Sequence, residues 1–228
     1  MNKITFFRSV RAATMVAGLV LAGGCGSFDV TDPNHPTVDD PINHPTRGKL
    51  SAAATGIFGV ARQDITSFIW RLGSMGREGM NIAGNNQPDY LEPFIGPVQA
   101  GGSFGGTLWT TQYAQILNVN TYLTALSRTP TSELSGAEKA VSIGFGKTFK
   151  ALALLYVVQT RANLGAPVDV DRPASAPPAP FVSEDSVYGY ITGLLDESRG
   201  SLLSGGGAFP FPMAPGPGSF PPPAGRPS

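Results

Sequence analysis

The sequence has one cysteine and two histidines, too few of the residues that build disulfides, metal sites and catalytic triads. Cys25 has no second cysteine to pair with. His35 and His44 are nine residues apart and each precedes a proline, whereas zinc ligands stand closer together or are joined by further ligands. No His-Glu-x-x-His segment occurs. We therefore predict a protein that is not an enzyme and that holds no metal and no cofactor.

Charged side chains are also scarce, at 14% of the sequence, and their formal sum is zero. Three of the basic residues belong to an N-terminal segment that we expect to be removed, which leaves 13 basic and 16 acidic residues. Binding to nucleic acid requires clustered lysine and arginine, and the remaining basic residues are dispersed. The sequence therefore predicts no nucleic-acid partner.

The first 24 residues are typical of an export signal. Basic residues precede the uncharged run 12–22, whose 11 residues fit the core of a signal peptide and are too few to span a bilayer. Two glycines and then Cys25 follow, which resembles the lipobox of bacterial lipoproteins, although Ala22 stands where a leucine is usual. We expect residues 1–24 to be cleaved and Cys25 to carry a lipid anchor. The alternative is an ordinary cleavage site that lies beside a cysteine.

Helical spacing dominates residues 47–204, and residues 135–167 carry its clearest signals. Ser135 and Glu138 are spaced as a capping box, in which each side chain binds a free N–H of the first turn. Gly165 and Pro167 are typical of a helix end. Other apolar repeats predict helices over 47–64, 65–81, 107–128 and from 183 to about 204, the second of them weak because of its glycines. No strand pattern appears, so the predicted fold class is all-α.

Three segments lack this periodicity. Residues 25–46 are rich in Asp, Asn and Pro and predict an extended tether between the lipid and the first helix. Residues 82–106 predict a long irregular loop. Residues 205–228 contain 14 Gly or Pro among 24 and predict a disordered tail, from which single phenylalanines could dock on the helices.

Two patterns suggest chemistry that the spacing does not support. The triplet 146–148, Gly-Lys-Thr, ends a phosphate-binding loop only when a glycine precedes it by five residues and a strand leads into it, and neither holds here. The acidic pairs 39–40, 169/171 and 196–197 lie in loops or on a polar helix side, whereas a glycosidase needs two carboxylates that face one another. We interpret these charges as solvated surface.

Aromatic residues around the irregular loop are the best candidates for ligand binding. Flat rings beside polar groups stack on sugars and bind their edges. Tyr90, within the loop, is the strongest candidate, followed by Trp109 and Trp70. Trp109 is spaced four residues from Tyr113, so a place in the helical core is the alternative for it.

Several segments together resemble the N-terminal half of the SusD/RagB family of nutrient-uptake outer-membrane lipoproteins. After Cys25 they are FDVTDPNHP at 28–36, YAQILNVNTYL at 113–123, AEKAVSIGFGKTFKALALLYVVQTRANLGAPV at 137–168 and SVYGYITGLLDES at 186–198. Their order along the chain carries the resemblance more than any one of them.

The resemblance covers residues 20–204 and implies a non-enzymatic protein with antiparallel, tetratricopeptide-like helix pairs. It implies an outer-membrane protein, lipid-anchored and surface-exposed, that binds a glycan or another nutrient for a SusC-like TonB-dependent transporter. Because family members run considerably further, it also implies a truncated N-terminal portion. The alternatives are a helical lipoprotein scaffold that binds a protein partner and a non-functional fragment of a SusD-like protein.

Overall fold

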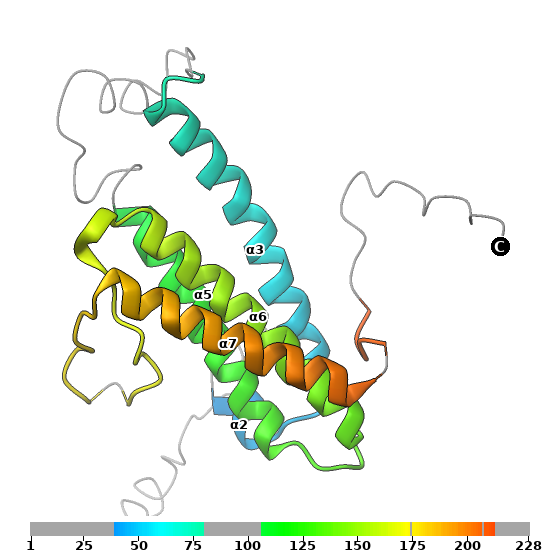
Figure 1. Cartoon of the computed structure of the whole chain (residues 1–228). Helices are drawn as coiled ribbons and strands as arrows, with labels where there is room; N and C mark the ends of the chain where they lie inside the picture. The colour runs from blue at the N-terminus through cyan, green and yellow to red at the C-terminus, as the bar shows by residue number, and fades with distance from the viewer. Residues whose placement is uncertain (1–38, 80–105, 174, 207, 213–228) are drawn as a thin grey trace, which may run out of the picture. The chain divides into compact units, whose positions relative to one another are not determined.

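The computed structural model describes residues 39–79, 106–173, 175–206 and 208–212. Within these ranges the chain is all-α, with six helices and no strand, as predicted. The α-helices are α2 (Asp39–Asn43), α3 (Arg47–Met75), α5 (Gly106–Arg128), α6 (Gly136–Gln159) and α7 (Glu184–Gly205), and a short 3₁₀ helix, η1 (Ala162–Leu164), follows α6 (Figure 1).

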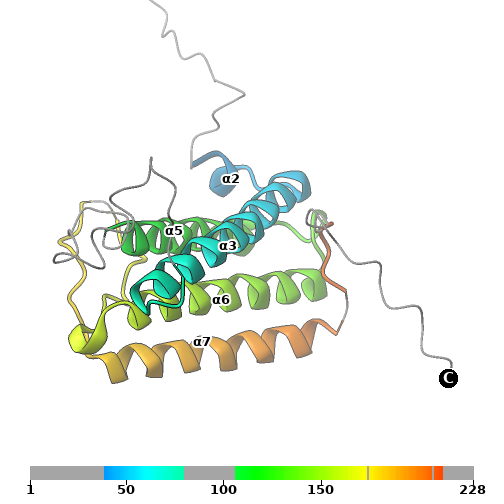
Figure 2. The same ribbon diagram turned by 90° about the horizontal axis from the view of Figure 1, so that it is seen from above.

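The helix α6 is the centre of the bundle. It packs on α7 along one side and on α5 along the other, while α3 runs obliquely across α5 and α6 (Figure 2). Ser135 caps α6 with the predicted capping box, since its hydroxyl accepts from the Glu138 N–H and the Glu138 carboxylate accepts from the Ser135 N–H. Ser183 caps α7 with its hydroxyl, which accepts from the Ser186 N–H. Both predicted helix starts are confirmed.

Three predicted boundaries differ from the structure. The helices predicted over 47–64 and 65–81 are one helix, because a glycine inside a helix costs only about 1 kcal/mol and α3 contains no proline. It ends at Met75, before the predicted end at 81. The end signals at Gly165 and Pro167 predicted a helix that continues to that point, but α6 ends at Gln159. The short helix η1 lies between this end and Gly165. The segment predicted as an extended tether contains the helix α2.

Two groups of buried side chains form the core. The first lies between α5, α6 and α7 and includes Leu154, Val157 and Val187, none of which is exposed to solvent. The second lies between α3, α5 and α6 and includes Leu50, Tyr122 and Leu126. Phe211 also belongs to the second group and is 4% exposed, so the packed body continues beyond the boundary predicted at 204.

The helix α6 is long and apolar enough to cross a membrane by length and composition, and 61% of its most apolar window is buried inside the structure. The core helix of a soluble protein has the same properties. Its contacts on two sides with α5 and α7 explain the apolar composition without a membrane.

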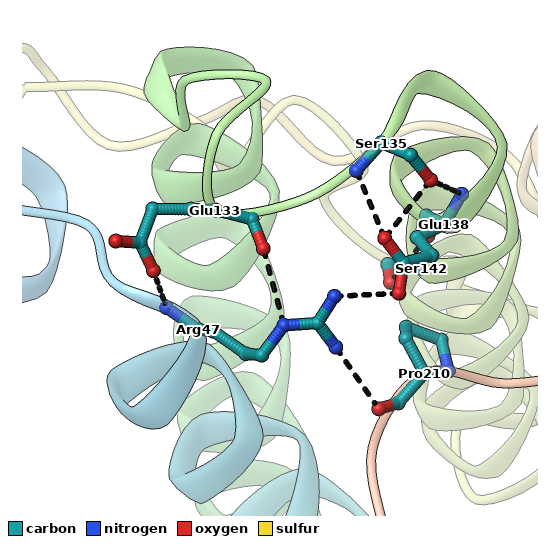
Figure 3. A network of polar contacts seen from close by, with 6 residues as sticks. All are labelled: Arg47, Glu133, Ser135, Glu138, Ser142 and Pro210. Atoms are coloured by element: carbon teal, nitrogen blue, oxygen red, sulfur yellow. Dashed lines mark hydrogen bonds and ion pairs between the residues drawn. The ribbon is translucent and has the colours of Figure 1, made fainter.

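A polar network around Arg47 joins the start of α3 to the α5–α6 turn (Figure 3). The Arg47 backbone N–H donates to the Glu133 carboxylate at 2.7 Å, and its guanidinium donates to the Glu138 carboxylate at 2.5 Å. A further donor of the guanidinium lies 3.5 Å from the Pro210 carbonyl oxygen. One arginine therefore connects α3, α6 and the segment that follows α7.

The Arg47 guanidinium and the backbone and hydroxyl of Ser135 lower the pKa of Glu138 from 4.5 to about 2. Because the folded-state pKa is depressed, the stabilisation is complete above the ordinary pKa and is lost as the pH falls from 4.5 toward about 2. We expect the free energy of unfolding of Glu138→Gln to lie below that of wild type at neutral pH and to converge with it in acid. Urea unfolding across this pH window measures the difference, and a gap independent of pH would contradict the assignment.

Candidate functional site

The structure describes two of the four residues predicted to bind lipid or ligand. Cys25 and Tyr90 lie outside the described residues. Trp70 is half-buried near the end of α3, with the Arg71 guanidinium 5.7 Å from its ring centroid. Trp109 is half-buried near the start of α5. It contacts two aromatic rings and one guanidinium, and this group of side chains is the best-defined candidate site.

Trp109 lies among two aromatic rings and one guanidinium. The ring centroid of Tyr113 is 4.6 Å away, and Phe181 stacks on Trp109 at 5.8 Å with 14° between the ring planes. The guanidinium carbon of Arg161 is 4.7 Å from the Trp109 centroid and 6.0 Å from the Phe181 centroid. We call Trp109, Tyr113, Arg161 and Phe181 the aromatic cluster.

Three separate segments position the aromatic cluster. Trp109 and Tyr113 are four residues apart on α5 and therefore project from one side of it. Arg161 occupies the N-cap position of η1, two residues after the end of α6 at Gln159. Phe181 precedes Val182, which pairs with Ala166 through two backbone hydrogen bonds of 3.2 Å. The cluster therefore forms only when α5, the end of α6 and the segment before α7 come together.

Tyr113 anchors the cluster to the turn after η1. Its hydroxyl donates to the Pro167 carbonyl oxygen at 2.8 Å. Burial raises the pKa of Tyr113 to about 12, while the nearby Arg161 charge acts in the opposite direction. The phenol is therefore neutral at physiological pH and serves as a hydrogen-bond donor.

The cluster presents an accessible ring beside a cation. Phe181 is 56% exposed, whereas Trp109 beneath it is half-buried. An exposed ring supported by a second ring can stack on a flat apolar face, and an adjacent guanidinium can donate hydrogen bonds to groups at the edge of that face. This arrangement suits a ligand that has an apolar face and polar substituents, such as a sugar.

Sequence reasoning missed Arg161 and Phe181. Arg161 stood in the predicted last turn of a helix, where a basic residue is common, and Phe181 stood in a polar, proline-rich segment. The pairing of Ala166 with Val182 brings Arg161 and Phe181 to Trp109. This pairing involves a single residue from each segment, so it leaves no periodic pattern in the sequence. Only the isolated large aromatic residue in that segment could have drawn attention to it.

The Gly-Lys-Thr triplet serves helix packing. A Cβ at Gly146 would lie 2.8 Å from the Leu123 side chain, so the glycine permits close approach of α5 and α6. Thr148 lies 2.7 Å from the Ser198 hydroxyl, oxygen to oxygen, and Lys147 forms an ion pair of 2.6 Å with Glu197 of α7. All three residues of the triplet thus make contacts within the bundle.

Lys147→Ala is expected to change the free energy of unfolding by less than about 1 kcal/mol, because the lost pair lies at the surface. Thermal unfolding of the variant beside wild type measures this. A larger loss of stability, or nucleotide binding by wild type that Lys147→Ala abolishes, would show that the triplet has another role.

One member of each acidic pair forms a surface ion pair. Asp40 lies 2.9 Å from the Lys49 ammonium, Asp169 lies 3.6 Å from Arg172, and Glu197 pairs with Lys147 as above. Among the described residues no three His, Cys, Asp or Glu side chains gather as metal ligands would.

One further spacing bears on enzymatic activity. Residues 101–105, GGSFG, match the Gly-x-Ser-x-Gly spacing of a nucleophile elbow, which is catalytic when it forms a sharp turn between a strand and a helix. Ser103 lies outside the described residues, and the described part of the chain contains no strand to precede it. The absence of enzymatic activity remains a prediction.

Comparison of the chain with protein-family models, with curated proteins and with solved structures gave no match.

Proposed function

We propose that this chain is a SusD-like lipoprotein that binds a glycan or another nutrient at the outer membrane without cleaving it. In this proposal Cys25 carries the lipid, and the bound nutrient passes to a SusC-like TonB-dependent transporter. The packing of α6 against both α5 and α7 supports the tetratricopeptide-like scaffold that the resemblance implies. The single observation that carries the binding role is the exposed Phe181 ring stacked on Trp109.

The test combines binding, turnover and copurification. The full chain, purified from membranes, is applied to an array of oligosaccharides, and the ligands that it retains are assayed for release of reducing ends. We expect retention of at least one oligosaccharide, no release of reducing ends, and copurification of a large β-barrel transporter. Turnover of a bound glycan, or an array without any retained member, would contradict the proposal.

A second candidate function, binding of a protein partner, is favoured by an apolar stripe on α3. Four large apolar side chains recur at helical spacing along its second half and are 37–63% exposed: Ile65, Ile69, Leu72 and Met75. Exposed apolar stripes of this kind mark protein interfaces. Copurification of a protein together with an array that retains nothing would favour this function over nutrient binding.

A further inference from the structure

The Arg161 guanidinium has no anionic partner among the residues that the structure describes. It forms neither an ion pair nor a hydrogen bond with any described residue, and its Nε atom is buried without an acceptor. Arg47, Lys49, Lys147 and Arg172 each pair with a carboxylate. Arg71 also has a buried Nε without an acceptor and lies beside one ring, that of Trp70, whereas Arg161 lies beside two. A buried donor without an acceptor costs free energy, and a ligand that supplies the acceptor recovers it.

The surroundings of Arg161 fix where such an acceptor would be held. The guanidinium lies over the Trp109 ring at 4.7 Å and beside the exposed Phe181 ring at 6.0 Å. A planar guanidinium held against aromatic rings keeps its hydrogen-bond donors directed along its edge, where they match a carboxylate or a sulfate. The neutral Tyr113 phenol adds no charge to repel an anion.

We infer that the aromatic cluster recognises an acidic saccharide, with a sugar ring on Phe181 and its carboxylate or sulfate group on Arg161. This inference rests on the proposed nutrient-binding function and names the ligand class. A neutral saccharide could use the ring surface alone, but it would leave the Arg161 charge without a counterion. The expected selectivity is therefore for anionic over neutral sugars of the same ring structure.

The test compares each acidic saccharide with a neutral form of the same sugar backbone. The probes are oligogalacturonate and oligomannuronate beside their methyl esters, and κ-carrageenan oligosaccharides, whose only charges are sulfates, beside their desulfated forms. We expect the full chain to bind at least one acidic probe about tenfold or more tighter than its neutral counterpart, because hydrogen bonds to charged groups are the stronger ones. The preference should weaken as salt rises. The pair that shows it distinguishes a carboxylate from a sulfate ligand.

Arg161→Gln is expected to abolish this preference, because the acidic and neutral probes then meet the same uncharged side chain. Arg161→Lys keeps the charge without the planar fork and should retain only part of the preference. Arg128→Gln removes the same charge from the exposed far end of α5 and should behave as wild type. Circular dichroism checks that each variant is folded, and the ratio of acidic to neutral affinity is the quantity compared among the variants.

The outcomes separate the two proposals. Equal binding of acidic and neutral probes by wild type would overturn the inference and leave nutrient binding intact. A preference that persists in Arg161→Gln would also overturn it, since the anion would then be held elsewhere. Binding of no oligosaccharide, acidic or neutral, would overturn both the inference and the proposed function.

Discussion

Gly165→Ala is expected to destabilise the protein by more than about 3 kcal/mol and to abolish ligand binding. Gly165 has φ +64° and ψ −163°, a backbone conformation that is open essentially to glycine alone. A Cβ there would lie 1.9 Å from the Val182 carbonyl oxygen, which accepts the hydrogen bond from Ala166. The substitution must therefore separate the two segments that bring Phe181 to Trp109.

Gly189→Ala is the matched control, because Gly189 lies within α7 and a Cβ there would meet nothing within 4 Å. Alanine favours a helix by up to about 1 kcal/mol over glycine, so the control should be slightly more stable than wild type. Urea unfolding measures both variants. A Gly165→Ala protein as stable as wild type would mean that the Ala166–Val182 pairing is not formed in solution.

Leu154→Ala is the second substitution with a large expected effect. Leu154 is completely buried on α6 in the group of side chains shared by α5, α6 and α7. Truncation of a buried leucine to alanine leaves a cavity and costs about 2–5 kcal/mol. We expect the midpoint of urea unfolding to fall accordingly, with the slope of the transition unchanged.

Leu117→Ala makes the same chemical change on α5, at a side chain that is 59% exposed. Surface substitutions of this kind change stability by no more than about 0.5 kcal/mol. Equal losses for Leu154→Ala and Leu117→Ala would contradict the central position of α6 in the bundle.

The sequence predicted best what depends on neighbouring residues. The caps at Ser135 and Ser183 follow from side chains that bind backbone N–H groups within their own first turn, so their spacing is visible in the chain. The central position of α6 followed from its apolar residues, which cover more than one face. Both features were read without knowledge of the packing.

The features that the sequence did not show depend on contacts between distant segments. The helix α3 continues through its glycines to Met75, and its second half contacts α6. The ring centroids of Phe68 on α3 and Tyr156 on α6 are 4.6 Å apart. The sequence allowed single phenylalanines of the tail to dock on the helices, but it did not show that Phe211 is the one buried in the core. Arg161 and Phe181 are 20 residues apart and meet only through the turn at Gly165. Propensity and spacing carry no information on such contacts.

The aromatic cluster as a glycan-binding surface is tested most directly by Phe181→Ala. Isothermal titration is performed with the oligosaccharide that the full chain retains most strongly, for wild type, Phe181→Ala and Leu203→Ala. Leu203 is 68% exposed on α7 and serves as the control for loss of an exposed apolar side chain. We expect Phe181→Ala to weaken binding at least about fivefold through the lost stacking, and Leu203→Ala to bind as wild type. Equal affinity of Phe181→Ala and wild type would contradict the account.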